Sequence, residues 1–265
     1  MTTTYEQLLP AVVKAANQGA DLLMSQFDPA ARPLDRPAIG SVGARIEKES
    51  QEAVRAGLDG LLPNAGWFDE DEYGNAVPPG EWWIVDGAEG GVNYVYGLAE
   101  WAVTVTLIRD GVPRLTVVRQ PIGDLTYTAV EGGGAYRNGL PLTVSAKTDL
   151  GVAMVTSSQA GNRPEVHARF GRAITAMLDA ALLVRNTIPT TFPILTVASG
   201  QHDVFFQYDP DLPGTAAGSL LVTEAGGVVT DLAGGPWRPD SPDVLIAAPG
   251  LHAAALKVLA DIELL

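Results

Sequence analysis

The chain changes its pattern of hydrophobic segments near residue 145, and this change constrains the fold more than any other feature. Before that point, strand-like segments follow one another with short turns between them, as in an antiparallel sheet. After it, strand-like and helical segments alternate until the end of the chain. This combination predicts an α/β protein with two fused layers. We therefore expect a single unit over residues 1–265, with an antiparallel half at 1–147 and an alternating half at 148–265.

The antiparallel half also contains two predicted helices and a hairpin. Apolar residues at helical spacing predict helices over 5–25 and 49–62, and prolines between them predict a loop to about residue 42. Asn138-Gly139 is typical of a type I′ turn, because both residues tolerate positive φ. We predict an acidic loop at residues 69–72. The predicted strands of this half are 82–85, 101–109, 114–120 and 125–130.

The alternating half consists of short predicted strands interleaved with helices. Its predicted strands are 153–156, 182–185, 203–207, 228–230 and 244–247. Its predicted helices are 164–178, 191–198, 215–225 and 251–264.

The composition is acidic and lacks cysteine. Lys and Arg number 17 against 31 Asp and Glu, which gives a formal net charge of −14. Such a surface repels nucleic acid, and a small anionic ligand would need a local positive feature such as a metal ion. The absence of cysteine excludes disulfides and thiolate metal sites. Residues 1–10 lack a signal-peptide pattern and no apolar stretch reaches the ~20 residues of a membrane span, so we expect a cytoplasmic protein without a membrane partner.

Residues 82–94 carry the richest chemical signal in the chain. A predicted strand ends at Asp86, Glu89 follows three residues later, and Gly90 and Gly91 lead into a predicted helical turn. Carboxylates can hold a divalent cation, and backbone N–H groups at the start of a helix can hold a phosphate. The alternative is a structural turn in which both carboxylates cap the next helix. The residues by themselves leave both interpretations open.

This segment resembles the signature of the inositol monophosphatase family, in which a strand ends in Asp-Pro-Ile/Leu-Asp-Gly-Thr-x-Asn-Phe/Tyr. Asp86, Gly90, Asn93 and Tyr94 match it. Further matches follow in family order at Leu62-Pro63, Glu70-Asp71, 132–139, 144–145, 197–200, 203–206, 216–218 and 224–227. The resemblance implies the family's layered αβαβα sandwich, a small-molecule substrate and a homodimer.

The resemblance also implies metal-assisted hydrolysis of a phosphate monoester. Mg²⁺ would be held by side chains of Glu70, Asp86 and Glu89 and by the backbone carbonyl of Ala88, and one ion fits the residues better than two. The same three carboxylates are the predicted catalytic residues. The predicted substrate-binding residues are Gly90, Gly91, Thr190 and Gln207.

The family pattern is incomplete at several positions. Glu89 replaces an Asp and reaches one methylene further, which matters because Mg²⁺ demands tight octahedral geometry. Gly91 replaces a Thr that helps to activate water, and Gly214 replaces an Asp that binds a second metal ion. The family's Thr/Lys-x-x-Asp site is also altered, to Glu47-Lys48-Glu49-Ser50.

Two residues could replace the carboxylate that is missing at Gly214. Asp209 and Asp211 lie just upstream, in a loop that could bend toward the site. The alternative is a solvated turn, because Asp-Pro-Asp is ordinary turn chemistry. The altered residues 188–191 and Gln207 predict a substrate other than simple inositol phosphate.

Three functional hypotheses remain open on these residues. The first is an enzyme of altered chemistry, in which Glu70, Asp86 and Glu89 act as general acid and base. The second is a Mg²⁺-dependent phosphatase of a small sugar or inositol phosphate. The third is a non-catalytic binding protein on the same fold. The departures at Gly91 and Gly214 favour the first hypothesis over the second.

Overall fold

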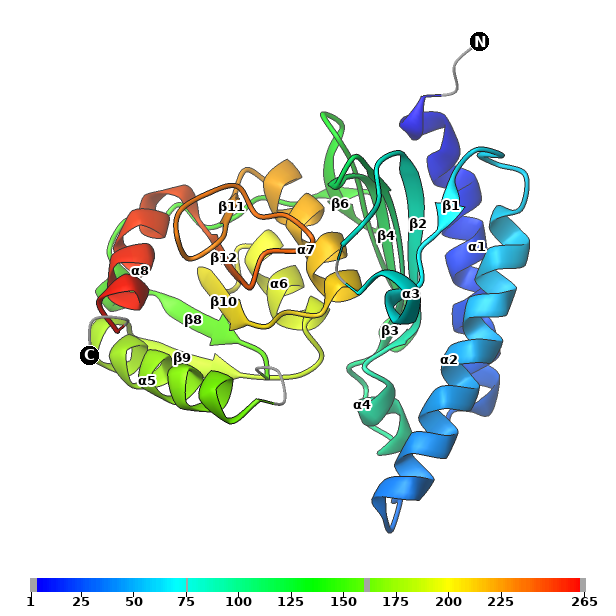
Figure 1. The fold of residues 1–265 in the computed structure, drawn as a ribbon, viewed down its shortest axis with the longest axis horizontal. Coiled ribbons are helices and arrows are strands. Elements are labelled where there is room, and N and C mark those ends of the chain that lie inside the picture. Colours follow the sequence, from blue (N-terminus) through cyan, green and yellow to red (C-terminus); the bar gives the residue numbers. More distant parts are fainter. Residues whose placement is uncertain (1–3, 75, 160–162, 263–265) are drawn as a thin grey trace. The chain divides into compact units, whose positions relative to one another are not determined.

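A computed structural model describes residues 4–74, 76–159 and 163–262. The chain divides into two compact units, unit 1 at Met1–Leu140 and unit 2 at Pro141–Leu265 (Figure 1). Each unit has its own sheet, helices and hydrophobic core. The structure therefore has the α/β class that the sequence predicts.

Unit 1 is built on a seven-stranded sheet whose strands lie in sequence order. β1 and β2 are parallel, and the pairs from β2 to β6 are antiparallel, as predicted. β2 continues past its predicted end to Glu89. The strands are β1 (Gly66–Trp67), β2 (Glu81–Glu89), β3 (Ala102–Arg109), β4 (Val112–Gln120), β5 (Leu125–Val130), β6 (Gly134–Arg137) and β7 (Leu140–Pro141).

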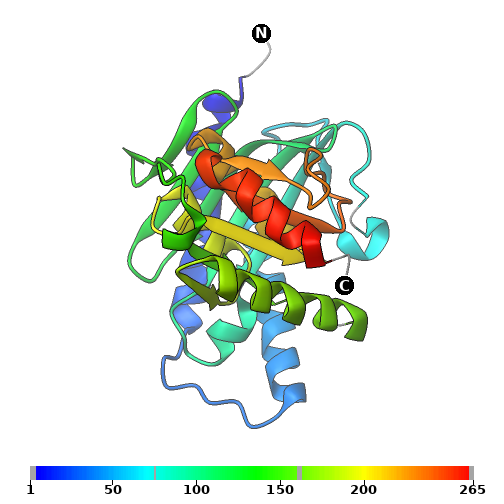
Figure 2. The same ribbon diagram turned by 90° about the vertical axis from the view of Figure 1, so that its left-hand side faces the viewer.

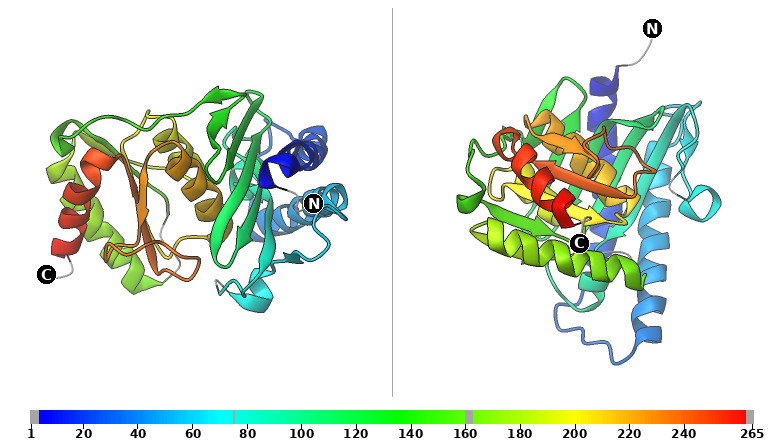
Figure 3. Two further views of the ribbon diagram at one scale, coloured as in Figure 1. Left: turned by 90° about the horizontal axis from the view of Figure 1, so that it is seen from above. Right: turned by 60° about the vertical axis from the view of Figure 1, so that its left-hand side comes forward.

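Two long helices, α1 (Tyr5–Gln26) and α2 (Arg36–Leu58), pack against each other on one face of this sheet (Figure 3). Their apolar faces and the inward-facing residues of β2, β3 and β4 form one core, which includes Val54, Trp83 and Val105. Burial of apolar side chains of this size contributes about 1.5–3 kcal/mol each. This core holds α2 against the end of β2, where the candidate site lies.

The short helix α4 (Gly91–Val95) follows β2 and is anchored in the same core. The buried Tyr94 packs against Trp101 with ring centroids 5.0 Å apart. Its hydroxyl donates a hydrogen bond to the carbonyl oxygen of Leu23 in α1 at 2.9 Å. The segment that follows Asp86 is therefore fixed by packing as well as by its own turn.

Helix α2 corrects the sequence prediction, which placed a loop to about residue 42 and a helix over 49–62. The helix spans Arg36–Leu58 instead. Asp35 caps it by accepting a hydrogen bond from the Ala38 N–H at 2.8 Å. Pro37 lies in the first turn, where the missing N–H of proline leaves no helical bond unmade. The proline that we interpreted as a helix breaker therefore starts the helix.

The predicted acidic loop at 69–72 likewise contains a short helix, α3 (Glu70–Tyr73).

Unit 2 is built on a five-stranded mixed sheet in the order β11-β12-β10-β8-β9. β8, β9 and β10 are parallel, and β11 and β12 join them as antiparallel neighbours. The strands are β8 (Met154–Ser157), β9 (Leu183–Asn186), β10 (Val204–Tyr208), β11 (Val228–Thr230) and β12 (Asp243–Ala247). Each lies within about one residue of its predicted position.

Helices cover both faces of the unit 2 sheet. α5 and α8 lie side by side on one face (Figure 2), and α6 and α7 pack together on the other (Figure 3). The helices are α5 (Pro164–Ala180), α6 (Thr191–Ala198), α7 (Leu212–Glu224) and α8 (Pro249–Asp261), with a 3₁₀ turn η1 (Leu150–Val152). α7 begins before its predicted start at residue 215, and the predicted end of the last helix, at residue 264, lies outside the described residues.

The predicted type I′ hairpin is confirmed. Asn138 has φ 51° and Gly139 has φ 76°, and they join β6 to β7. These are the left-handed angles that such a turn requires at both central residues. In the described part of the chain, no helix combines the length and the apolar character that a membrane span would need.

Candidate active site

The end of strand β2 is bulged, and the bulge brings two predicted site residues together. Asp86 pairs with Thr104 and Glu89 pairs with Ala102, so a three-residue step on β2 faces a two-residue step on β3. In a regular strand, side chains three residues apart point to opposite faces. The extra residue in β2 cancels this alternation. The Asp86 and Glu89 carboxyl groups consequently share a hydrogen bond.

The Asp86 carboxyl group has a pKa raised well above its ordinary value. Burial is the largest cause, followed by the negative charges of Glu47 and Glu89, which both also hydrogen-bond to Asp86. The raised pKa makes the Asp86 carboxyl group easier to protonate than an ordinary aspartate. Asp86 Oδ1 also accepts a hydrogen bond from its neighbour Ala88 N–H at 2.8 Å, which orients the carboxyl group.

Glu47 is the member of this cluster that the sequence analysis missed. It lies on α2, and its Oε1 accepts a hydrogen bond from the Gly87 N–H at 2.9 Å. One helical turn later, Gln51 Nε2 donates to the Val85 carbonyl oxygen at 2.9 Å. The sequence contained a signal, since the residues from Glu47 to Ser50 stand in an altered family site. The predicted helix began only at residue 49, however, and so did not carry Glu47 to the end of β2.

Gly87 permits this close approach between α2 and β2. A Cβ atom at Gly87 would lie 2.6 Å from the Glu47 carbonyl oxygen and 2.7 Å from the Gln51 backbone nitrogen. Both contacts are far below ordinary van der Waals separation. The family signature has proline at this position, and proline has no N–H to donate. Glycine here therefore supplies both the space and the donor that Glu47 uses.

The other predicted site residues of unit 1 are Ala88, Gly90, Gly91 and Glu70. Gly90 has φ 84° and caps α4, and the buried Ala88 lies between the two carboxylates in sequence. A Cβ atom at Gly91 would meet no heavy atom within 4 Å, so the position opens onto free space. Glu70 is exposed at the start of α3.

In unit 2, the two predicted substrate-binding residues contact each other. The Thr190 hydroxyl donates a hydrogen bond to Gln207 Oε1 at 3.2 Å, and Gln207 Nε2 donates to the Gln159 carbonyl oxygen at 2.9 Å. Thr190 is 4% exposed and Gln207 is 3% exposed. Thr190 starts α6, and Gln207 lies on β10. The neighbouring strand and helix therefore present a small polar cluster inside unit 2.

Asp211 joins this polar cluster, whereas Asp209 does not. Asp211 caps α7 through a hydrogen bond that its Oδ2 accepts from the Gly214 N–H at 3.0 Å. Burial raises the pKa of Asp211, and hydrogen bonds from Thr190 and the Gly214 N–H oppose the rise. Asp209 is exposed and pairs with Arg163 at 3.2 Å. The solvated-turn interpretation therefore describes Asp209. The Asp211 carboxylate instead contacts Gly214, the position where the family signature has an aspartate.

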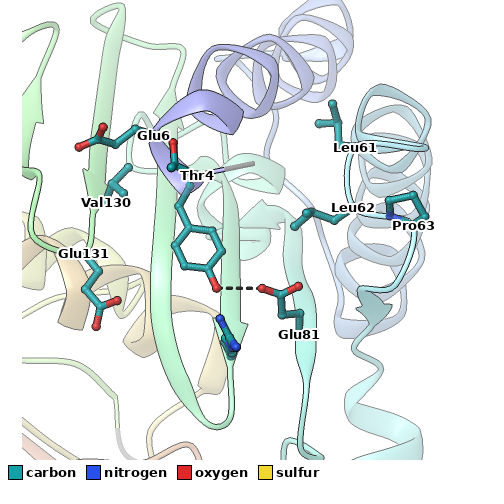
Figure 4. Close-up of a pocket in the computed structure, with 10 residues that line it drawn as sticks. Thr4, Glu6, Leu61, Leu62, Pro63, Glu81, Val130 and Glu131 are labelled. Carbon is teal, nitrogen blue, oxygen red and sulfur yellow. Dashed lines mark hydrogen bonds between the residues drawn. The ribbon is translucent and has the colours of Figure 1, made fainter. Parts of the chain in front are cut away.

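One pocket of unit 1 is lined by none of the predicted site residues. It has a volume of about 620 Å³ and opens between the start of α1, the loop after α2 and the adjoining strands. The Tyr5 hydroxyl donates a hydrogen bond to Glu81 Oε1 at 2.8 Å. Figure 4 shows Glu81 with Leu62 and Pro63 nearby. Burial raises the pKa of Tyr5, opposed by its hydrogen bond to Arg109. The Tyr5 hydroxyl is therefore paired with both Glu81 and Arg109 in this pocket.

A model of the inositol monophosphatase family matches residues 4–264. The chain belongs to the inositol monophosphatase family. Within this family, the probable inositol 1-monophosphatase ImpA of Mycobacterium tuberculosis is 33% identical over 196 residues, which cover 72% of this chain and 73% of ImpA. The putative Nus factor SuhB of Neisseria meningitidis is 28% identical over 85% of this chain and 87% of SuhB. The solved inositol monophosphatase of Anabaena has a TM-score of 0.83 at 22% identity, over 97% of this chain and 96% of that structure, which confirms the fold.

The donor set of this inositol monophosphatase family member is the kind that Mg²⁺ prefers. Asp86, Glu89, Glu47 and the Ala88 carbonyl all offer hard oxygen ligands. In the described part of the chain, no three acidic, histidine or cysteine side chains surround one point as a finished metal site would. The carboxyl groups instead meet in pairs through Asp86. A cation would fit this chemistry by offsetting the negative charges that meet at Asp86.

Proposed function

We propose that this chain is a Mg²⁺-dependent phosphatase of a small phosphate monoester. The observation that carries the proposal is the cluster of Glu47, Asp86 and Glu89, in which two neighbouring carboxyl groups raise the pKa of a third. Such a group is costly to ionise without a counter-charge, and a divalent cation supplies one. Relatives named inositol monophosphatases support the same reaction class. Glu47 adds a carboxylate that the sequence analysis had not counted, and so favours hydrolysis over altered chemistry.

The proposed ligands of Mg²⁺ are Asp86, Glu89, Glu47 and the Ala88 carbonyl, with Glu70 as a further carboxylate. When bound, Mg²⁺ would neutralise phosphate charge and lower the pKa of a bound water. The bound cation would favour the ionised form of Asp86, so cation binding would lower the pKa of Asp86. Ala88 N–H and Gly87 N–H keep the Asp86 and Glu47 carboxyl groups oriented in the meantime.

The proposed phosphate contacts come from the start of α4. Gly90 and Gly91 leave the first N–H groups of α4 without a side chain in front of them, so that phosphate oxygens can approach. The substrate-binding role of Thr190 and Gln207 in unit 2 stays a prediction. A homodimer and a cytoplasmic location, both expected from the sequence, stay predictions.

A second candidate function rests on Gly91. Without a hydroxyl group at this position, the chain lacks the side chain that helps to activate water in the family signature. Asp86 would then serve as the general acid–base group, because its raised pKa keeps its proton available closer to neutral pH. This enzyme would act on a small molecule without Mg²⁺.

Phosphate release from a panel of sugar, glycerol and inositol monophosphates, with and without Mg²⁺, tests the two functions. The proposal expects turnover that requires Mg²⁺ and falls at least about 100-fold in Asp86→Asn. The exposed Asp59, at the end of α2, provides a matched control, because Asp59→Asn makes the same change outside the cluster. Isothermal calorimetry with Mg²⁺ alone gives a readout independent of activity. Absence of both Mg²⁺ binding and phosphate release would refute the phosphatase.

A further inference from the structure

A pocket of unit 1 adjoins the carboxyl cluster and is lined mainly by apolar and small residues. It has a volume of about 410 Å³, within the range of roughly 300–1,000 Å³ that is typical of small-molecule sites. One wall is the first half of α2, and the other is the start of α4, which lies beside it (Figure 1). Among the described residues that line it, Glu47 alone carries a polar side chain. The pocket therefore has one charged end and an apolar remainder.

Glycine residues keep this pocket open. Cβ atoms at Gly40, Gly43 and Gly91 would each meet no heavy atom within 4 Å. Gly40 and Gly43 lie inside α2, where glycine costs about 0.5–1 kcal/mol relative to alanine. The apolar side chains at the rim, Ile39 and Val92, come from the two opposite walls. Half of the Val92 side chain is exposed, at 50%.

We infer that this pocket binds an apolar group of the substrate, so that the preferred substrates are phosphate monoesters of an aliphatic alcohol and not of a polyol. This inference rests on the proposed phosphatase function. Glu47 belongs both to the pocket lining and to the carboxyl cluster, so a phosphate at the cluster would have its organic part within reach of the pocket. A polyol such as inositol would lose the water around its hydroxyl groups there and find few hydrogen-bond partners.

The test compares two primary alkyl esters, n-hexyl phosphate and glycerol 1-phosphate, with Mg²⁺ present. We expect kcat/KM to be at least about tenfold higher for n-hexyl phosphate, since apolar contacts in a pocket discriminate by factors of this order. Gly43→Leu fills the pocket with a good helix former and should reduce this ratio toward one. Gly171→Leu is the matched control. Gly171 is an exposed glycine in α5, and a Cβ atom there also meets no neighbour, so its variant should keep the full ratio.

Binding of n-hexylphosphonate by calorimetry gives a readout that does not need turnover. The pocket would be supported if phosphonate binding is weaker in Gly43→Leu and unchanged in Gly171→Leu. A preference for glycerol 1-phosphate, or an n-hexyl preference that Gly43→Leu leaves unchanged, would overturn the inference while the phosphatase stands. If neither ester is hydrolysed, the wider panel and Mg²⁺ calorimetry decide the proposed function, and phosphonate binding that is insensitive to Gly43→Leu would overturn the pocket.

Discussion

The Gly87 N–H donates a hydrogen bond to the Glu47 carboxylate at 2.9 Å, and this contact joins helix α2 to the bulged end of strand β2. It has two consequences for the site. The bond orients Glu47 beside Asp86, where the negative charge of Glu47 helps to raise the Asp86 pKa. It also depends on a residue without a side chain, because α2 leaves no room for a Cβ atom at Gly87.

We predict that Glu47→Gln lowers the pKa of Asp86. The glutamine keeps an Oε1 atom for the Gly87 N–H, so the packing of α2 against β2 should survive. It removes the negative charge that is the second cause of the raised pKa, after burial. The measurement is an NMR titration of the Asp86 side-chain carboxyl carbon in the absence of divalent cations. An unchanged titration would show that Glu47 does not act on Asp86 electrostatically.

We predict that Asp86→Asn removes a pH-dependent loss of stability. Because the folded-state pKa is raised, the folded chain holds a proton that the unfolded chain releases near its ordinary pKa of about 3.9. Stability should therefore fall as pH rises from that value through the raised pKa, and then level off. In Asp86→Asn this fall should be absent, while the amide oxygen can still accept from the Ala88 N–H.

Thermal unfolding of both proteins between about pH 4 and about pH 8, in a chelating buffer, measures this difference. Each kcal/mol should appear as a shift in Tm of roughly 2–4 °C. Under the proposed function, added Mg²⁺ should raise the Tm of the wild type more than that of Asp86→Asn. A constant difference in Tm across the whole pH range would contradict the raised pKa.

The same substitution at two glycines of unit 1 should have opposite effects. Gly43→Ala should stabilise the fold by about 0.5–1 kcal/mol, because the position is helical and open. Gly87→Ala should destabilise it by about 1–3 kcal/mol, because the new Cβ atom would press on the α2 backbone. Urea unfolding curves measure both changes. A stabilising Gly87→Ala would show that α2 can move away from β2 at little cost.

We predict that Asp211→Ala destabilises unit 2 by about 1 kcal/mol. The substitution removes the N-cap of α7 and the acceptor of a Thr190 hydrogen bond. Asp211→Asn keeps an acceptor for the Gly214 N–H and should cost less. Asp209→Asn is the matched control, since asparagine tolerates the positive φ of 54° at this position and the change removes only an exposed ion pair with Arg163, so stability should change by about 0.5 kcal/mol or less. Equal losses in the Asp209 and Asp211 variants would argue against the cap.

The sequence by itself predicted most of the secondary structure, because hydrophobic periodicity and turn residues are local properties. The hairpin at Asn138-Gly139 was predicted from two residues. The start of α2 was not, since Pro37 is compatible both with a loop and with the first turn of a helix. Whether Asp35 caps such a helix depends on which conformation the chain adopts around it.

The family and the Asp86–Glu89 pair were likewise determined by the sequence, since they lie in one short signature. The position of Glu47 beside Asp86 was decided by the tertiary structure. Glu47 lies 39 positions before Asp86 (86 − 47 = 39), and no local pattern joins the two. The packing of α2 on the sheet, the bulge in β2 and the missing Cβ atom of Gly87 bring these carboxyl groups together. The raised pKa of Asp86 follows from burial and from the nearby charges of Glu47 and Glu89, which are properties of the folded chain.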